Sequence, residues 1–202
     1  MRKNLNITHY LVMDLTTKPL DNIDEADYKS NHPNDEELKS LKYYPEYNEL
    51  TGVNFGYFVR EGDEVHMRVN SYTAPEKELL TTIQEVLKKT SSLKVSGYNL
   101  VNNDIPLLVK RFIINEMKVP NEIDIIDIKP WTTSVMDISN LWKGSAFTNV
   151  SLNEAHSAVN KFDPIIGEED VLLNLYKAGE ILLRIIQPDK YITKVIKSKN
   201  PE

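Results

Sequence analysis

The stretch GYNLVNNDIPLLVKR, residues 97–111, carries the densest set of signals in this chain of 202 residues. An apolar segment at 93–98 predicts a strand, and the apolar spacing from Ile105 onward predicts a helix that tolerates Pro106 in its first turn. Asp104 therefore stands where a strand gives way to a helix. Such a residue can cap the helix or bind a divalent ion through its carboxylate.

A second aspartate ends an apolar run closer to the start of the chain. Residues 9–15 read as a buried strand that carries Asp14 near its end. Two further strands are predicted at 50–60 and 65–72, and the Glu-Gly-Asp-Glu sequence between them indicates a hairpin. We expect these three strands to form an antiparallel unit.

The remaining segments predict alternating helices and strands. A helix is expected at 75–90 and a short strand at 123–128, and Ser151 with Glu154 forms a capping box ahead of another helix. A further helix is expected to begin at Glu168 and end at Gly179, followed by a helical segment at 180–199 interrupted by Pro188. The pattern predicts one α/β domain over 1–202, with a mixed central sheet flanked by helices, a polar loop at 18–49 and a basic tail at 195–202.

Composition narrows the chemistry. With 24 basic and 30 acidic residues the formal net charge is −6, which argues against broad attraction to a polyanion but leaves metal-dependent nucleic-acid binding open. The absence of cysteine excludes disulfides, thiolate metal sites and a cysteine nucleophile. No long apolar run occurs, so we expect no membrane association and a cytoplasmic location.

These motifs resemble the DEDD-type 3'-5' exonucleases, in particular the stand-alone bacterial and phage relatives of the proofreading domain of family B DNA polymerases. Asp14-Leu15-Thr16-Thr17 is similar to the first motif of that family, Asp-Ile-Glu-Thr, and residues 97–111 are similar to the second. The resemblance extends through segments that carry no catalytic group, at 129–131, 136–143, 151–154 and 167–179. It implies a ribonuclease H-like exonuclease fold.

The resemblance also implies a site. Asp14, Asp104 and Asp189 correspond to the catalytic carboxylates that bind one or two magnesium or manganese ions, where Asp189 is found by counting on from Gly179 to the third motif. Asp170 is the rival for that third position. The second motif further suggests three nucleic-acid-binding residues, Asn99, Asn102 and Arg111.

Two positions depart from the family pattern. Thr16 stands in place of a glutamate ligand, and Ile185 stands in place of the tyrosine that orients the attacking water. Hydrolysis by two metal ions needs carboxylates to hold both ions, so these replacements predict weakened or lost catalysis. A substitute ligand from the acidic segment that follows, at Asp21, Asp24 or Glu25, is a further hypothesis.

We therefore expect a 3'-5' exonuclease-family protein that acts on or binds 3' ends of single-stranded DNA, with RNA as a second substrate class. The alternative is a catalytically inactive nucleic-acid-binding or protein-interaction module, encoded by a phage. Tyr43, Tyr44 and Tyr47 either stack on bases or cover a core edge. No histidine has metal-ligand spacing, and His156 is expected to pack or hydrogen-bond on its helix.

Overall fold

The computed structural model describes residues 5–21, 23–34, 44–124, 135–144, 150–160, 165–167 and 170–197. Its strands are β1 (Tyr10–Pro19), β2 (Asn48–Glu61), β3 (Glu64–Tyr72), β4 (Lys94–Gly97), β5 (Val135–Asp137) and β6 (Ile192–Lys197). Its helices are α1 (Glu25–Asn31), α2 (Glu76–Lys89), α3 (Asp104–Ile114), α4 (Ile138–Lys143), α5 (Leu152–Val159) and α6 (Leu173–Ile186), with 3-10 turns η1 (Ile7–His9) and η3 (Pro45–Tyr47).

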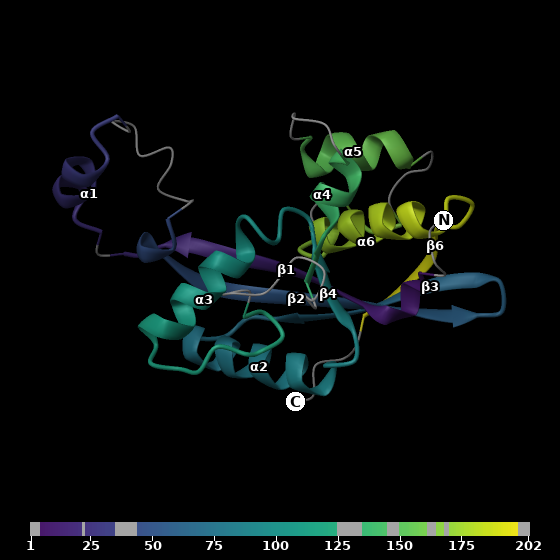
Figure 1. Ribbon diagram of the computed structural model, residues 1–202, viewed down its shortest axis with the longest axis horizontal. Helices are drawn as coiled ribbons and strands as arrows, with labels where there is room; N and C mark the ends of the chain where they lie inside the picture. Colours follow the sequence, from purple (N-terminus) through teal and green to yellow (C-terminus); the bar gives the residue numbers. More distant parts are fainter. Residues whose placement is uncertain are drawn as a thin grey trace.

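The strands form one mixed sheet in the order β5-β4-β1-β2-β3-β6. The first three strands are antiparallel, as predicted, whereas β4 pairs with β1, β5 with β4 and β6 with β3 in parallel. Helices α2 and α3 cover one face, and α4, α5 and α6 lie over the other, while α1 projects beyond the sheet (Figure 1). This arrangement confirms the predicted α/β class with a mixed central sheet flanked by helices.

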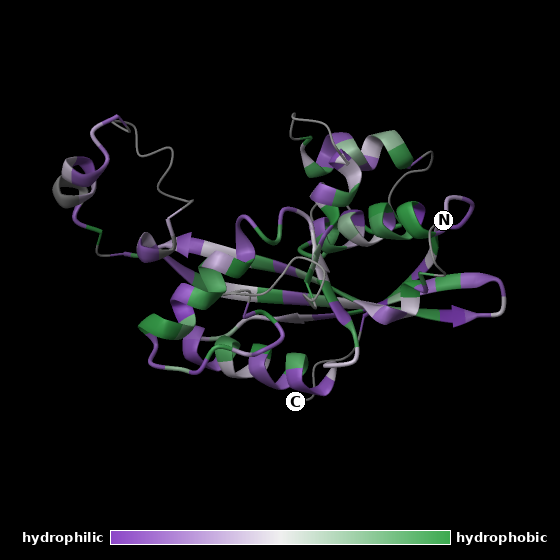
Figure 2. Cartoon of the chain, viewed as in Figure 1, coloured by the Kyte–Doolittle hydropathy of each residue, from purple (hydrophilic) through white to green (hydrophobic). Residues whose placement is uncertain are grey.

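The core is divided by the sheet into two layers. Along β1, Tyr10 and Val12 belong to the layer shared with α6, whereas Leu11 and Met13 belong to the layer shared with α2 and α3. This alternation follows from the two-residue period of a strand, and Figure 2 shows hydrophobic residues along the sheet and the helices that cover it. It places the next even position, Asp14, on the α6 side of the sheet.

Gly179 does not end a helix, contrary to the sequence prediction. Helix α6 begins at Leu173 and continues through Gly179 to Ile186. A Cβ atom at Gly179 would lie 2.9 Å from the Sδ and Cε atoms of Met67 on β3. The glycine therefore permits close approach of the helix to the sheet.

The predicted helical segment at 180–199 is also wrong in its second half. Helix α6 stops at Ile186, Pro188 lies in the turn that follows, and residues 192–197 form the edge strand β6. The β-branched residues of this strand pair with β3 in parallel, so tertiary pairing overrides the helical pattern. The first residues of the predicted basic tail thus belong to the sheet, and 198–202 lie outside the described residues.

The region 18–49 is not a continuous loop. It contains the end of β1, helix α1, the turn η3 and the start of β2. The rings of Tyr28, His32, Tyr44 and Tyr47 contact one another, with the centroids of His32 and Tyr44 4.2 Å apart and Tyr28 fully buried. Tyr44 and Tyr47 therefore cover a small core, whereas Tyr43 lies outside the described part of the chain.

Two further predictions meet the limits of the described chain. Ile123 and the residues just before it form a turn, and most of the strand predicted at 123–128 falls in a part that the structure does not describe. The parallel partner of β4 is β5 instead. None of the helices in the described ranges has the length and apolar character needed to cross a membrane.

Candidate active site

Asp14 lies in the middle of the sheet, opposite Asn54 on β2. The Asn54 side chain is buried, and its Nδ2 donates to Asp14 Oδ2 at 3.4 Å and to the Val171 carbonyl oxygen at 3.3 Å. Burial raises the pKa of Asp14 to about 6, against the opposing effect of the hydrogen bond from Asn54. The Asp14 carboxylate is thus held beside the segment that leads into α6.

Asp104 begins α3, as predicted, and it is brought close to Asp14. Burial raises the pKa of Asp104 well above its ordinary value, and the negative charges of Asp14 and Asp137 raise it further. No donor within the described residues hydrogen-bonds the Asp104 carboxylate. Two carboxylates that are buried and repel each other favour either protonation or a nearby cation.

Asp137 holds the loop in front of α3 in place, although the sequence motifs assign it no role. Its Oδ1 accepts hydrogen bonds from the Asn99 backbone N at 3.1 Å and the Ser139 Oγ at 2.7 Å, and its Oδ2 accepts from the Val101 backbone N at 2.9 Å. The backbone N of Ser139 also donates to it at 2.9 Å. These bonds tie the end of β5 to the loop between β4 and α3.

A pocket of about 330 Å³ opens beside Asp14. Its polar lining comes from five segments and comprises Asp14, Tyr98, Asn99, Asn103, Ser139, Lys143, Ser151 and Asn174. Asn99 adopts the left-handed conformation with φ of 58°, and the Nδ2 of Asn102 donates to its Oδ1 at 3.1 Å. The predicted residue Asn99 therefore lines the pocket, and Asn102 supports it.

Lys143 and Asn174 are pocket residues that the motifs did not single out. Asn174 lies one helical turn before Ala178, which also lines the pocket, so this edge of α6 faces Asp14. The sequence signal for Asn174 was its position as the single amide in the otherwise apolar run Val171-Leu172-Leu173-Asn174-Leu175. Lys143 lies at the end of α4, a helix that the sequence pattern did not predict.

The structure does not bring Asp189 to this site. Asp189 lies in the turn after α6, where the neighbouring Lys190 Nζ donates to the Asp63 carbonyl oxygen at the tip of the β2–β3 hairpin. Asn54, the partner of Asp14, and Asp63 are separated by nine residues, which is more than about 20 Å of extended strand at roughly 3.3 Å per residue. The predicted position came from counting about ten residues beyond Gly179, and that count leads past the end of α6 at Ile186.

The other third-motif candidates are engaged elsewhere. Ile185 packs against the core on the last turn of α6, away from the Asp14 pocket. Asp170 precedes α6, where its Oδ1 accepts from the Leu172 backbone N at 3.0 Å and its Oδ2 binds Lys197. Neither residue lines the pocket beside Asp14.

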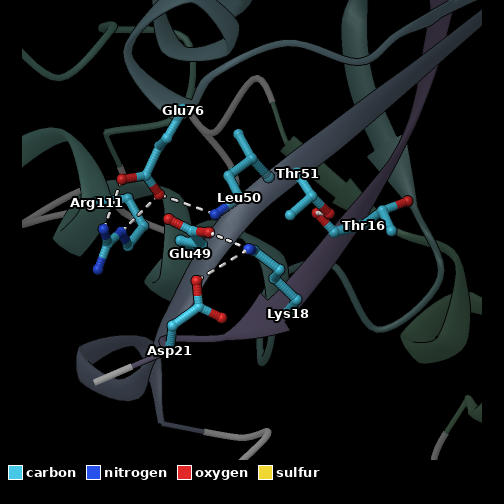
Figure 3. Close-up of polar contacts among 8 residues, drawn as sticks. All are labelled: Thr16, Lys18, Asp21, Glu49, Leu50, Thr51, Glu76 and Arg111. Carbon is cyan, nitrogen blue, oxygen red and sulfur yellow. Dashed lines mark hydrogen bonds and ion pairs between the residues drawn. The ribbon is translucent and has the colours of Figure 1, made fainter. Parts of the chain in front are cut away.

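Arg111 is not available to a nucleic acid, contrary to prediction. It is 5% exposed, and its Nε donates to Glu76 Oε1 at 2.7 Å while a second nitrogen binds Oε2 (Figure 3). The same glutamate accepts from the Leu50 backbone N at 2.8 Å and from Asn115 at 2.9 Å. Arg111 therefore joins α3 to α2 and β2 as part of the fold.

The acidic substitutes for Thr16 also lie away from the pocket. Thr16 points to the same side of the sheet as Asp14 but is exposed, at a register shift between β1 and β2. Asp21 follows the end of β1 and contacts Lys18 at 3.7 Å (Figure 3). Asp24 follows still later, and the side chain of Glu25 lies outside the described residues.

The residues at the pocket fit one hard cation better than two. In the described ranges, no three acidic or histidine side chains are close enough together to hold a metal ion by themselves. Magnesium, however, is commonly bound by one or two carboxylates, with waters and substrate phosphates completing its shell. Within the described residues, Asp14 and Asp104 could supply the carboxylates for a single ion, whereas a larger ligand set for a second ion is not found there.

No protein-family model matches the chain, and no curated protein matches it. A solved structure of an "ExoI/SSB-Ct complex" is similar at 11% sequence identity with a TM-score of 0.46, and the similarity covers 89% of this chain. The chain spans only 41% of the length of that protein.

Proposed function

We propose that this protein binds the 3' end of a single-stranded nucleic acid at the Asp14–Asp104 pocket, together with one magnesium or manganese ion, and that it hydrolyses the end slowly or not at all. The observation that carries the proposal is the pair of partly buried carboxylates with raised pKa values, of which Asp14 lines a polar pocket and Asp104 directly follows the lining residue Asn103. Such groups are far more common at functional sites than elsewhere in a fold.

The lining of the pocket supports a nucleotide as ligand. Lys143 supplies a positive charge for a phosphate, and Asn99, Asn103 and Asn174 supply amides that can donate to or accept from a sugar hydroxyl. An ion held by Asp14 and Asp104 would act as a Lewis acid toward phosphate oxygens. The net charge of −6 makes the bound ion a requirement for bringing a polyanion to this acidic centre.

The same residues support weak or absent hydrolysis. Thr16 offers a hydroxyl in place of a carboxylate, and the third predicted carboxylate, Asp189, lies remote from the pocket. If each missing contact lowers the rate by about 10- to 1,000-fold, two losses leave on the order of a ten-thousandth of full activity. Binding needs fewer ligands than catalysis, so it survives the loss more readily.

The test is fluorescence anisotropy with a single-stranded DNA oligonucleotide labelled at its 5' end, titrated with protein in the presence of Mg²⁺ or of chelator. We expect Mg²⁺-dependent binding that Asp104→Asn weakens by at least tenfold and that Asp189→Asn leaves unchanged. An oligonucleotide with a blocked 3' hydroxyl should bind more weakly. Equal binding by all variants, with and without Mg²⁺, would contradict the proposal.

The rate is checked on the same protein with 3'-labelled and 5'-labelled oligonucleotides and Mn²⁺. We expect little or no release of the 3' label over hours, and any release should disappear in Asp14→Ala. Rapid loss of the 3' label that depends on Asp14 would show a competent nuclease and would contradict the weakened-site part of the proposal. An RNA oligonucleotide of the same sequence ranks the two substrate classes.

A further inference from the structure

A second pocket, of about 380 Å³, lies on the other side of α6 from Asp14. Its lining comes from the end of α5, the middle of α6, the segment at 165–167 and the start of β6, and it comprises Asn160, Ile165, Tyr176, Glu180, Tyr191, Ile192 and Thr193. Positions 176 and 180 lie roughly 200° and 240° around the helix axis from Asn174, at about 100° per residue. The two pockets therefore use different sides of one helix.

Glu180 places a carboxylate within this pocket while being only 2% exposed. Its Oε2 accepts from the Ile192 backbone N at 3.2 Å, the hydroxyl of Tyr176 hydrogen-bonds to it, and Arg184 exerts an attractive charge from one turn further along the helix. A carboxylate can accept about four hydrogen bonds, so acceptor capacity remains toward the pocket. Keeping such a group buried is costly unless it has a use or a strong partner.

The walls of the pocket are apolar and partly open to solvent. Tyr191 is 51% exposed and Ile165 is 47% exposed, so both large side chains present accessible surface at the pocket. Ile192 forms a buried part of the wall, and the ring of His156 stands edge-on to Tyr176 behind it at a centroid distance of 6.0 Å. Predominantly apolar walls with a few convergent polar groups are typical of small-molecule sites.

We propose that this pocket binds a small organic ammonium compound, with the ammonium group donating to Glu180 and an aromatic body lying against Ile165, Tyr191 and Ile192. The carboxylate of Glu180 determines which class of ligand the pocket favours. A buried carboxylate repels an anion, whereas an ammonium group forms a charge-assisted hydrogen bond that is about twice as strong as a neutral one. The face of Tyr191 adds an attractive surface for a cation or an aromatic ring.

The test is an NMR titration of the full chain with phenethylamine, followed through the backbone amides of residues 191–193. We expect saturable shifts of these amides, and at least tenfold weaker binding by 2-phenylethanol and phenylacetate. Glu180→Gln retains an acceptor for the Ile192 N–H but removes the charge, and it should weaken phenethylamine binding at least tenfold. Its circular dichroism and the response of the Asp14 pocket to Mn²⁺ should stay unchanged.

A second variant keeps the proposal testable if Glu180→Gln folds poorly. Ile165→Trp changes an exposed wall residue, fills part of the opening and should reduce binding of phenethylamine by several fold. The proposal is overturned if phenethylamine binds no better than 2-phenylethanol, if Glu180→Gln binds it as well as the unaltered protein, or if the shifts occur away from β6. None of these outcomes depends on nucleic-acid binding at Asp14.

Discussion

Helix α3 contributes one residue to each of two acidic sites: Arg111 contacts Glu76, and Asp104 lies near Asp14. The way the carboxylates are bound distinguishes a structural site from a functional one. Glu76 is bound by Arg111, Asn115 and the Leu50 backbone N. Burial raises the pKa of Glu76, but these hydrogen bonds outweigh it and leave the pKa below its ordinary value. At the other end of α3, Asp104 is buried beside Asp14, and both pKa values are raised.

The comparison teaches that the two sites contribute to stability with opposite sign. A carboxylate that gains partners on folding stabilises the folded state, whereas one that loses water and gains a like charge destabilises it. The fold therefore keeps Asp14 and Asp104 ionised only at a cost, which a bound cation would offset. The Glu76–Arg111 pair needs no ligand.

The largest effect is expected from breaking the paired site. Arg111→Ala leaves Glu76 buried without its main partner and should lower the free energy of unfolding by about 3–5 kcal/mol. This loss in the free energy of unfolding is measured by urea denaturation at pH 7. The double variant Glu76→Gln with Arg111→Met removes both charges and should recover a large part of the loss; a loss below about 1 kcal/mol in the single variant would contradict the structural role.

A substitution at the Asp14–Asp104 site is expected to raise the stability of the fold instead of lowering it. Asp14→Asn removes a carboxylate whose pKa is about 6 in the fold, and without metal it should raise the free energy of unfolding at pH 7 by on the order of 1–3 kcal/mol. The matched control, Asp189→Asn, lies in a turn and should change stability by less than about 0.5 kcal/mol. Destabilisation by Asp14→Asn would show that Asp14 serves the fold.

The pH dependence of stability sharpens the contrast. Because the pKa of Asp14 is raised, from 3.8 to about 6, its ionisation costs stability as the pH rises through that window. The stability advantage of Asp14→Asn should therefore be small near pH 4 and reach a plateau above pH 6. Glu76 acts in the other direction, because its pKa is lowered: its contribution is present above about pH 4.5 and is lost as the pH falls further.

The smallest effect is expected from an exposed ion pair, in which a basic and an acidic side chain interact without being buried. Lys18 contacts Glu49 at 2.9 Å and Asp21 at 3.7 Å, and its side chain is largely in solvent. Lys18→Ala should change the free energy of unfolding very little in urea denaturation, with any loss reduced further in 0.5 M salt. An effect as large as that of Arg111→Ala would mean that burial is not what distinguishes the sites.

The local sequence patterns around Asp14 and around Asp104 were sufficient to predict these two residues of the site. Asp14 ends a β-branched and apolar run, and Asp104 stands between a strand and a helix, so each position follows from the residues around it. The sheet order then brings the two carboxylates near each other, because β4, which leads to α3, lies directly beside β1. The antiparallel hairpin and the Ser151 capping box were likewise readable from short stretches.

The incorrect predictions concern segments whose structure depends on contacts between residues far apart in the sequence. Gly179 looks like a helix end until Met67 is placed against it. Counting on from this glycine to the third motif selected Asp189, whereas Asn174 is the residue of α6 that lines the pocket. Arg111 belongs to a motif that suggested a nucleic-acid contact, but its partner Glu76 lies 35 residues earlier. The strand β6 exists because β3 offers an edge for it.

The most direct test of the central claim is the number and location of Mn²⁺ ions bound, measured by electron paramagnetic resonance titration of the unaltered protein and of three variants. The account predicts about one bound ion, lost or weakened at least tenfold in Asp14→Asn and Asp104→Asn and retained in Asp189→Asn. Binding that survives both Asp14→Asn and Asp104→Asn, or that Asp189→Asn abolishes, would contradict it.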